Sequence, residues 1–215
     1  MQKFEEITDG IYRLCIPFED IYTSVFLIEA NGGYLLFDAA SSAADAEQYI
    51  IPAIAHMGAM PEQILISHSH DDHAGGLARL IFQFPDAKIG MLDLAYTERH
   101  SDWNWSKICN GDILLGCIKI LHLPGHTADC IGLFDLRTNT LLSADCLQLH
   151  GIGRFGIGIQ DLKNYMETLT KLSHMNINCI VAAHDYEPLG FLACGKENVK
   201  KYLAECQNAA AKLSV

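Results

Sequence analysis

The chain has 215 residues, of which 50% are hydrophobic and 19% are charged, and this balance is typical of a globular protein. Its formal net charge of −11 argues against a nucleic-acid partner, because phosphate contacts need clustered Lys and Arg side chains. No run of about 18 apolar residues occurs, and the first residues lack an apolar signal region. We therefore expect no membrane-spanning helix and a cytoplasmic location.

Strand signals dominate the first part of the chain. Asn31-Gly32-Gly33 between two apolar runs indicates a hairpin turn. Ala43–Met57 has helical periodicity, although Pro52 should kink this helix or restart it. Ala74–Phe84 carries apolar residues at helical spacing. The expected strands are Ile11–Pro17, Thr23–Glu29, Tyr34–Asp38, Gln63–Ser67 and Lys88–Leu92.

The second part of the chain repeats the alternation of strands and helices. Several short strands are expected over Asp112–Leu149, followed by an amphipathic helix over Asp161–Met175. Cys179–Ala183 is typical of a buried strand, and the residues from Lys196 to the C-terminus are expected to form a last helix. This order predicts sheets covered by helices.

Domain boundaries and disulfide bonds are not indicated. The chain has no internal repeat, low-complexity tract or polar linker, so residues 1–215 are predicted to form a single domain. The eight cysteines are scattered and form none of the Cys-x-x-Cys pairs that bind zinc or undergo redox cycling. In a cytoplasmic protein, such thiols are expected to be reduced and mostly buried.

One short segment carries most of the chemistry. His68, His70, Asp72 and His73 form the pattern His-x-His-x-Asp-His directly after a predicted strand. Imidazole nitrogens and carboxylate oxygens suit zinc, and they suit iron or manganese less exclusively. The glycines Gly75 and Gly76 follow, and such small residues permit a close approach of the backbone. We therefore predict a metal site at this segment.

If this segment holds two metal ions, further ligands must come from elsewhere in the chain, because four side chains cannot satisfy two ions. His126, Asp145 and His184 each stand after an apolar run near the end of a predicted strand. Taken singly, each of them is also compatible with a structural role. Their order and context together raise them as candidate ligands.

The sequence resembles the metallo-β-lactamase fold superfamily. The resemblance rests on His68-Ser69-His70-Asp71-Asp72-His73, then Pro124-Gly125-His126-Thr127, then Ala144-Asp145, and then His184. It covers the chain from about Thr23 to His184. The resemblance implies an α+β fold, a four-layer αβ/βα sandwich in which two mixed β-sheets lie face to face and are flanked by helices.

The resemblance also implies two divalent metal ions, with Zn2+ expected and iron or manganese as alternatives. One ion is assigned to His68, His70 and His126, and the other to Asp72, His73 and His184, with Asp145 bridging them. Asp38 matches an early aspartate of the family and is expected to hold a ligand imidazole in one tautomer. A turn residue is an equally good interpretation of Asp38.

The chemistry expected of such a site is hydrolysis. Two dications about 3.5–4 Å apart can share a hydroxide that forms from water at neutral pH. We expect this metal-bridging hydroxide to attack a small ester, thioester, lactone or amide. Asp72, as ligand and hydrogen-bond acceptor, is the candidate catalytic residue that orients the hydroxide and relays its proton.

Departures from particular subfamilies narrow the field. Secreted metallo-β-lactamases have Cys or Ser where this chain has Asp145, which argues against a role in antibiotic resistance. Diiron flavoproteins of this fold usually have Glu at the position of His70 and carry a flavodoxin domain. Hydroxyacylglutathione hydrolases and N-acyl homoserine lactonases share the ligand set, although the former have an additional basic, helical C-terminal region. None of these comparisons identifies the substrate.

Alternative functions stay open at this point. Cleavage of a small phosphodiester is compatible with the fold, and so is persulfide oxidation at a single iron. A non-catalytic metal-binding module is disfavoured by the complete ligand set. The expected partner is a small-molecule substrate, and formation of a homo-oligomer is left open.

Two segments are candidates for loops over the site. His100–Trp105 is either an aromatic lid or a packed aromatic corner, and Leu149–Gly156 has four glycines in eight residues, which permit movement. Arg154 is the candidate contact for a substrate carboxylate or phosphate. Cys146 follows Asp145 directly and is expected to face the core, because neighbouring side chains of a strand point to opposite faces.

Overall fold

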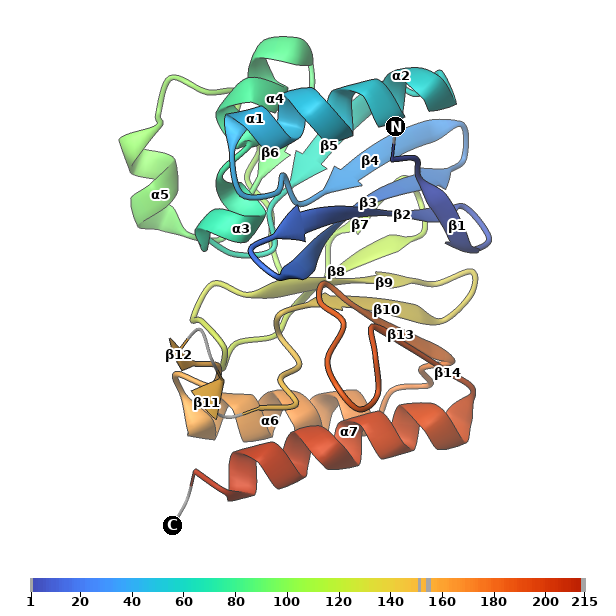
Figure 1. Ribbon diagram of the computed structural model, residues 1–215, viewed down its shortest axis with the longest axis vertical. Coiled ribbons are helices and arrows are strands. Elements are labelled where there is room, and N and C mark those ends of the chain that lie inside the picture. Colours follow the sequence, from blue (N-terminus) through green and yellow to red (C-terminus); the bar gives the residue numbers. More distant parts are fainter. Residues whose placement is uncertain (1, 151, 154–155, 214–215) are drawn as a thin grey trace. The chain divides into compact units, whose positions relative to one another are not determined.

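The computed structural model describes residues 2–150, 152–153 and 156–213. The chain divides into two compact units, Met1–Cys117 and Ile118–Val215, and each unit combines a β-sheet with helices on it (Figure 1). The prediction of a single domain over 1–215 stays a prediction.

The sheet of the first unit has six strands in the order β1-β2-β3-β4-β5-β6. Strands β1 to β4 pair in antiparallel fashion, whereas β4, β5 and β6 are parallel to one another, so this sheet is mixed. A short strand β7 follows in the chain. The bounds are Glu5–Thr8 for β1, Ile11–Phe18 for β2, Ile21–Ala30 for β3, Gly33–Phe37 for β4, Pro61–Leu65 for β5, Lys88–Gly90 for β6 and Ile113–Leu114 for β7.

The hairpin between β3 and β4 shows why the chain turns where it does. Asn31 and Gly32 both have positive φ, 51° and 81°, and the strands on either side pair from Ala30 with Gly33 onward. Two positive φ angles characterise the two-residue turn whose twist matches that of the strands, and Asn-Gly is the sequence that adopts it most readily. The predicted hairpin is confirmed.

Helices α1, α2 and α4 lie on one face of the sheet of the first unit, whereas α3 and α5 lie beside the ends of its strands (Figure 1). Residues 43–57 stay helical throughout, and Pro52 lies at the start of α2, where a π-helical turn passes into α-helix, so the predicted interruption is a change of helix type. A π-helical turn, Ala46–Ile50, precedes α2. The bounds are Ala43–Asp45 for α1, Ile51–Met57 for α2, Asp71–Ala74 for α3, Leu77–Gln83 for α4 and Leu94–Arg99 for α5.

The core of the first unit lies between these helices and the sheet. Side chains of α2 and α4, such as Ile54 and Leu80, pack with residues of the central strands, such as Leu36 and Ile64, and all four are at most 1% exposed. This burial anchors the end of β5, from which the predicted metal-binding segment continues.

The second unit is built on a sheet in which β14, β13, β10, β9 and β8 follow one another. Its only parallel pair among the described strands is β10 with β13; the pairs β8–β9, β9–β10 and β13–β14 are antiparallel. The bounds are Ile118–His122 for β8, Ile131–Asp135 for β9, Thr140–Ala144 for β10, Cys179–Ala182 for β13 and Leu192–Cys194 for β14, with a separate pair β11 (Ile152–Gly153) and β12 (Gly156–Ile157).

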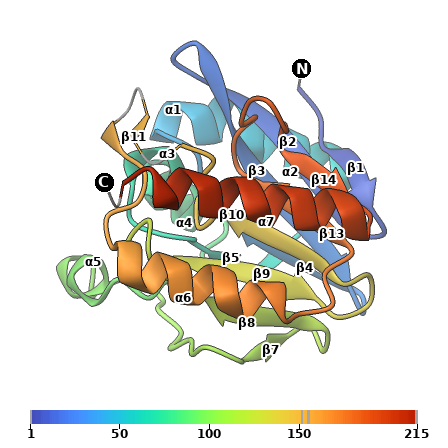
Figure 2. The ribbon, with the colours of Figure 1, turned by 90° about the horizontal axis from the view of Figure 1, so that it is seen from below.

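Helices α6 (Leu162–Ser173) and α7 (Lys196–Ala211) lie side by side over this sheet (Figures 1 and 2). Tyr165, Leu169 and Leu172 of α6 are fully buried against the sheet, as the helical pattern predicts. Met166 of the same helix is 38% exposed, because it lies at the border of the buried stripe. Two mixed sheets with helices on them confirm the predicted α+β fold class.

The prediction for the cysteines is wrong for one pair. Cys179 and Cys194 form a disulfide that links β13 to the antiparallel strand β14, where these two residues are direct partners. Sequence spacing could not show this contact, since 15 positions separate the two residues and β14 was not predicted. Cys146, in contrast, is fully buried in the core of the second unit, as expected. Within the described part of the chain, no helix combines the length and the apolar character that crossing a membrane requires.

Candidate metal centre

In the first unit, the predicted ligands follow the carboxyl end of β5. The chain stays extended beyond Leu65, with Ile66 N–H donating to the carbonyl of Gly90, and then turns at His70 into the short helix α3. Asp72 and His73 lie in that helix. His68 and His73 are completely buried, whereas His70 and Asp72 are partly exposed. The motif is therefore a strand end followed by one helical turn, which directs several side chains to the same edge.

Two imidazoles of the motif face each other. Nε2 of His68 lies 2.9 Å from Nδ1 of His70, and the two rings meet edge to face. The ring of His73 also contacts that of His68, with centroids 4.3 Å apart. Nε2 of His73 lies 3.3 Å from Oδ2 of Asp72. Lone-pair nitrogens aimed at one point suit a shared cation better than they suit each other.

Asp38 holds two of these rings in position. Its carboxylate is fully buried at the end of β4 and accepts hydrogen bonds from both the amide and the hydroxyl of Ser67, at 2.7 and 3.0 Å. Nδ1 of His73 lies 2.8 Å from Asp38 Oδ2, and Nδ1 of His68 lies 3.0 Å from the Ser67 hydroxyl oxygen. Both imidazoles thus donate through Nδ1, which leaves the Nε2 lone pair for a metal ion. Asp38 therefore makes the contact that its predicted role requires.

The backbone after the motif packs too closely for side chains. A Cβ atom on Gly75 would lie 2.0 Å from the carbonyl oxygen of Ser41, and one on Gly76 would lie 2.1 Å from that of Ala39. The amide of Ala39 also donates to the carbonyl of His73 at 2.7 Å. Glycine at both positions lets the segment after Asp38 contact α3 directly and keeps Asp38 next to the motif.

In the second unit, strand topology brings two distant ligands together. Strands β10 and β13 run parallel, and Ala144 at the end of β10 is the partner of Ala182 at the end of β13. Asp145 and His184 follow these strand ends, and both are less than 10% exposed. Carboxyl ends of neighbouring parallel strands lie at the same edge of a sheet, where functional side chains of α/β proteins commonly gather.

The carboxylate of Asp145 divides its two oxygens between two histidines. Oδ1 lies 3.3 Å from Nε2 of His184, and Oδ2 lies 3.8 Å from Nε2 of His126. Each oxygen thus faces a different imidazole nitrogen. A carboxylate in this arrangement suits a bridge between two cations, each of which would have its own histidine.

His126 is supplied by the loop after β8. Its Nδ1 lies 2.6 Å from the carbonyl oxygen of Gly158, so Nδ1 carries the proton and Nε2 is left for a ligand. Gly125 has a φ of 140°, and a Cβ atom there would lie 2.6 Å from the backbone of Tyr165 in α6. The loop is therefore held against the start of α6 by a close contact that only glycine permits.

A hydrogen-bonded pair that was not predicted also contacts Asp145. The hydroxyl of Tyr186 donates to Oδ1 of Asp145 at 3.2 Å and accepts from Nε2 of Gln148 at 3.1 Å. Burial raises the pKa of Tyr186 well above its usual value, and the negative charge of Asp145 raises it further, so the phenol keeps its proton. The only signals in the sequence are short distances along the chain, since Tyr186 follows His184 by two residues and Gln148 follows Asp145 by three.

The predicted loop residues have different outcomes. Arg154 lies outside the described residues, as do Gly151 and Phe155, so the substrate contact assigned to Arg154 stays a prediction. His100 and Trp103 stack with ring centroids 4.2 Å apart, and Trp103 and Trp105 both pack against the core of the first unit. This segment is thus a packed aromatic corner, the second of the two interpretations.

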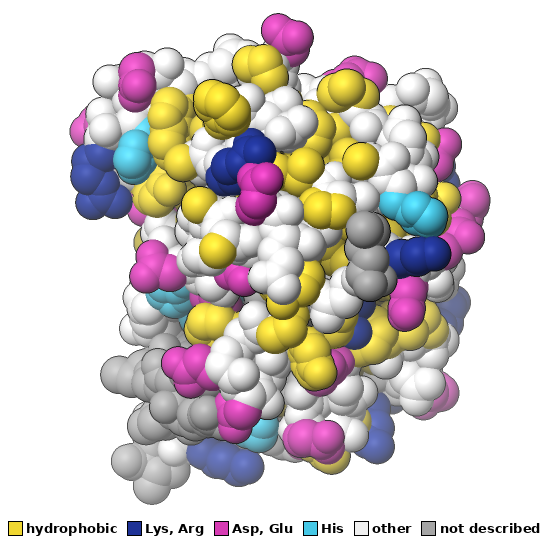
Figure 3. All heavy atoms as spheres, turned by 45° about the horizontal axis from the view of Figure 1, so that its top comes forward, with side chains coloured by type: hydrophobic (Ala, Val, Ile, Leu, Met, Phe, Trp, Pro, Cys, Tyr) yellow, Lys and Arg dark blue, Asp and Glu magenta, His cyan; other side chains and the backbone are white. Residues whose placement is uncertain are grey.

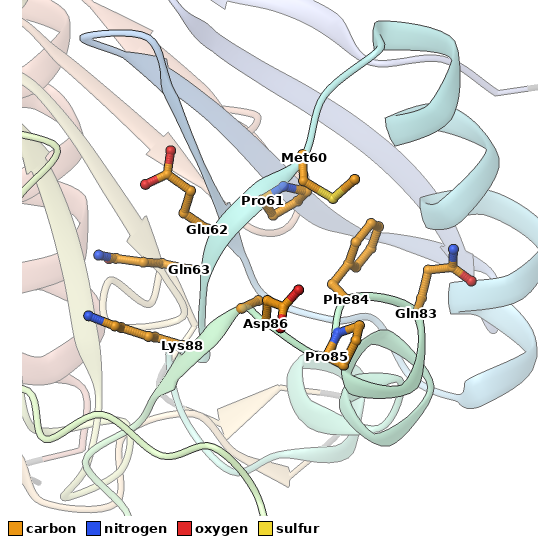
Figure 4. Close-up of a pocket in the computed structure, with 10 residues that line it drawn as sticks. Met60, Pro61, Glu62, Gln63, Gln83, Phe84, Pro85, Asp86 and Lys88 are labelled. Carbon is orange, nitrogen blue, oxygen red and sulfur yellow. The ribbon is translucent and has the colours of Figure 1, made fainter.

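A cavity of about 470 Å3 opens elsewhere in the first unit (Figure 4). Met60 and Phe84 lie on one side of it, whereas Gln63 and Lys88 extend from the other (Figure 4). It lies at the amino ends of β5 and β6, while the histidine motif follows the carboxyl end of β5. The cavity is therefore not the metal site.

The distribution of charge agrees with the acidic composition. On the face shown in Figure 3, the described Lys and Arg side chains lie apart from one another, between acidic and hydrophobic ones. Arg79, for example, pairs with Glu47 on the helices of the first unit. The expected lack of a nucleic-acid partner stays a prediction.

The donor set of the chain fits divalent metal ions. All seven predicted ligands belong to groups of His and Asp side chains that can hold a metal ion. Five of them are imidazoles and two are carboxylates, a set that is typical of zinc and also accommodates iron or manganese. For His68, His73 and His126, a hydrogen bond at Nδ1 leaves Nε2 for the ion. The residues present therefore match the ions that the resemblance implies.

Comparison with protein families gives a match over most of the chain. The model of the metallo-beta-lactamase superfamily matches residues 19–184, a range that includes Asp38 and all seven predicted ligands and extends into both units.

Curated relatives include named hydrolases. A hydroxyacylglutathione hydrolase of Rhodopseudomonas palustris is 32% identical over 84% of this chain and 69% of its own length. A beta-lactamase-like protein 2 homolog of Caenorhabditis elegans is 25% identical over 86% of this chain, and an atrochrysone carboxyl ACP thioesterase of Aspergillus fumigatus is 24% identical over 71%. The chain spans 64% and 47% of the length of these last two relatives.

Solved structures show the same fold at low sequence identity. A metallo beta lactamase from Hirschia baltica has a TM-score of 0.71 and is 17% identical, with 95% of this chain and 97% of that chain covered. The rubredoxin oxygen:oxidoreductase of Desulfovibrio gigas has a TM-score of 0.76 at 16% identity, with 97% of this chain and 62% of that chain covered. Proteins with this fold thus include lactamases and an oxidoreductase, and the fold alone does not specify the reaction.

Proposed function

Because the chain belongs to the metallo-beta-lactamase superfamily, we propose that it is a hydrolase that uses two divalent metal ions. The observation that carries the proposal is the carboxylate of Asp145, whose two oxygens face Nε2 of His184 and Nε2 of His126. A side chain placed in this way suits a bridge between two ions. A single ion would need only one of the two histidines.

The proposed ligands fall into two sets. His68, His70 and His126 hold one ion, Asp72, His73 and His184 hold the other, and Asp145 contacts both. The approach of His68 Nε2 to His70 Nδ1, at 2.9 Å, supports the first set, and that of Asp72 Oδ2 to His73 Nε2, at 3.3 Å, supports the second. Zn2+ is the proposed metal because imidazole-rich sites with carboxylates suit it.

Two divalent ions would supply a water-derived nucleophile at neutral pH and polarise the bond to be cleaved. The side chains of the protein would relay protons and hold the ligand imidazoles in position. Asp72 is partly exposed and its carboxylate is a hydrogen-bond acceptor, so it is the proposed proton relay. Asp38 and Ser67 hold His68 and His73 in the tautomer that keeps Nε2 unprotonated.

The proposed substrate is a small ester, thioester, lactone or amide. Two relatives are named hydroxyacylglutathione hydrolase and ACP thioesterase, and these names support acyl substrates. Cleavage of a small phosphodiester and persulfide oxidation at a single iron are the alternatives. Metal content and a substrate panel separate all three.

The experiment has two parts. The purified chain is analysed for bound metals and then assayed, loaded with Zn2+, against chromogenic esters, thioesters, lactones, phosphodiesters and β-lactams. We expect about two zinc ions per chain and turnover of at least one acyl substrate. One iron per chain without hydrolysis would overturn the proposal in favour of oxidation, and turnover of phosphodiesters alone would overturn the substrate class.

Asp145→Asn tests the bridge itself. Asparagine keeps the size of the side chain but removes its charge, so we expect fewer than two ions per chain and loss of the hydrolysis. The matched control is Asp161→Asn, because Asp161 caps the N-terminus of α6 and asparagine caps a helix equally well. Two bound ions and full activity in Asp145→Asn would refute the assignment.

A further inference from the structure

The side-chain contacts of Asp145 extend beyond the histidines. The hydroxyl of Tyr186 lies 3.2 Å from Asp145 Oδ1, the oxygen that also faces Nε2 of His184. Tyr186 and His184 belong to the same turn, in which the amide of Tyr186 donates to the carbonyl of His184. Tyr186 is thus tied both to one proposed ligand through the backbone and to another through its hydroxyl.

Gln148 determines which way the hydroxyl of Tyr186 points. Its side-chain amide donates to the hydroxyl oxygen of Tyr186 at 3.1 Å and to the backbone carbonyl of Asp145 at 2.8 Å. Because the phenol oxygen already accepts a hydrogen bond, its own proton is directed to the carboxylate of Asp145. The hydrogen bonds run in one direction, from Gln148 through Tyr186 to Asp145.

Gln148 is itself held by the helix beneath it. The hydroxyl of Tyr165 in α6 accepts a hydrogen bond from the backbone amide of Gln148 at 2.8 Å. The same hydroxyl donates to the backbone carbonyl of Gln148 at 2.9 Å. Tyr165 is completely buried, and Gln148 is 5% exposed. The donor side chain therefore starts from a backbone that is fixed at both of its polar groups.

We propose that Tyr186, supported by Gln148, is a positioning residue that sets the rotation of the Asp145 carboxylate. The proposal rests on the proposed function, because it concerns the side chain that would bridge two ions. It concerns the orientation of a ligand and assigns Tyr186 no contact with the substrate.

The physical reason lies in the torsion of the carboxylate. The terminal torsion of aspartate is broad and has no sharp staggered preference, so the side chain alone does not fix the plane of its two oxygens. A bridge, however, requires each oxygen to face a different ion. A donor on Oδ1 restricts the rotation and directs Oδ2 to the side of His126, from whose Nε2 it lies 3.8 Å. Outer hydrogen bonds of this kind are worth about 10–100-fold in metal affinity.

Tyr186→Phe removes only the hydroxyl. The matched control is Tyr202→Phe in α7, because the buried hydroxyl of Tyr202 has no hydrogen-bond partner among the described residues. The affinity of each variant for Zn2+ is measured by competition with a chromogenic chelator, and the absorption spectrum is recorded after loading with Co2+. We expect Tyr186→Phe to lose about 10–100-fold in affinity for at least one ion and to shift the Co2+ spectrum. Tyr202→Phe should match the wild type within about twofold, far below the effect of an outer hydrogen bond.

A merely structural role for Tyr186 predicts a different result. The melting temperature of the metal-free protein would fall, whereas the Zn2+ affinity and the Co2+ spectrum of the loaded protein would stay unchanged, and this result would overturn the proposal. If the wild type itself binds no divalent ion, the proposed function fails. If the wild type binds two ions and Tyr186→Phe binds them equally well, only the positioning role fails.

Gln148→Met provides a second variant that is independent of any folding defect in Tyr186→Phe. Methionine has a similar length but no amide donor, so the hydroxyl of Tyr186 loses the partner that directs it. We expect a smaller loss of affinity than in Tyr186→Phe and, in the double variant, a total loss below the sum of the two free-energy changes, because both residues act through one hydrogen bond. Additive effects would show that Gln148 does not act through Tyr186.

Discussion

The two units supply their proposed ligands in different ways. In the first unit, His68, His70, Asp72 and His73 lie within six consecutive residues at one strand end. In the second unit, His126, Asp145 and His184 come from three separate loops, and the parallel pairing of β10 with β13 brings the last two together. A motif confined to one segment is legible in the chain, whereas a dispersed set depends on strand order.

The support for the ligands differs in the same way. In the first unit, the rings of His68 and His73 are held by side chains, through Ser67 and Asp38. In the second, Nδ1 of His126 is held by the backbone carbonyl of Gly158, and Asp145 by the hydroxyl of Tyr186. Substitutions can therefore remove the support of the ligands in the first unit directly, while the support of His126 responds only to changes in its loop.

The largest effect is expected from removing one proposed ligand from each unit. His68→Ala and His126→Ala should each lower kcat/KM by more than about 100-fold, the upper end of the effect of a residue that only orients a ligand. Both variants should also bind fewer than two ions per chain. Metal analysis and steady-state kinetics check this prediction. If His126→Ala kept full activity, His126 would not belong to the site, and the second unit would not supply ligands in the proposed way.

Removal of the outer support is expected to have a smaller effect. Asp38→Asn places an amide next to Nδ1 of His73 and weakens the hydrogen bonds from Ser67, so Zn2+ affinity should fall by about 10–100-fold. Equilibrium dialysis against a zinc buffer measures the change. Asp45→Asn is a suitable control, since Asp45 lies in α1 and its carboxylate accepts a hydrogen bond from the hydroxyl of Ser42 at 2.7 Å. Equal affinities in both variants would leave Asp38 with the role of a turn residue.

Substitution of the glycines next to the proposed ligands should lower stability in both units. A Cβ atom on Gly76 would lie 2.1 Å from the carbonyl oxygen of Ala39, and one on Gly125 would lie 2.6 Å from Tyr165. Gly76→Ala and Gly125→Ala should each lower the free energy of unfolding by about 1–3 kcal/mol, the usual cost of overpacking. Urea denaturation of the metal-free protein measures this change. Gly32→Ala separates crowding from backbone strain. Gly32 has a φ of 81°, but no atom lies within 4 Å of the added Cβ, so any loss of stability there comes from strain alone.

The smallest effect is expected at the surface of the helix that follows the motif. Phe82 in α4 is 81% exposed, and the guanidinium of Arg79 lies over its ring, 5.3 Å from the centroid. Phe82→Ser should change the free energy of unfolding by no more than about 0.5 kcal/mol and leave Zn2+ affinity unchanged. A larger loss in thermal denaturation would show that α4 supports the motif through its outer face as well.

Local signals accounted for much of the fold. Asn31-Gly32 identified the hairpin, and Pro52 identified the point at which a π-helical turn passes into α2. Strand β14 and helix α5 were missed, because three-residue and six-residue elements carry too few positions to show a period. The Cys179–Cys194 disulfide was missed for the same reason, since it depends on β14.

The chemistry of the site was determined by the sequence itself. A run of three histidines and an aspartate, followed by glycines, specifies metal ligands and the close packing behind them without reference to the rest of the chain. The resemblance to the superfamily, which the family match confirms, then pointed to His126, Asp145 and His184. These predictions could be made because ligand type and local spacing are properties of single residues and short segments.

Only the tertiary structure decided how the ligands are held. The two oxygens of Asp145 face different histidines because parallel pairing joins the ends of β10 and β13. The contact of Tyr186 with Asp145 links positions 41 residues apart, and that of Asp38 with His73 links positions 35 residues apart. Such contacts depend on strand order and on side-chain rotation, and neither leaves a periodic signal in the amino-acid sequence.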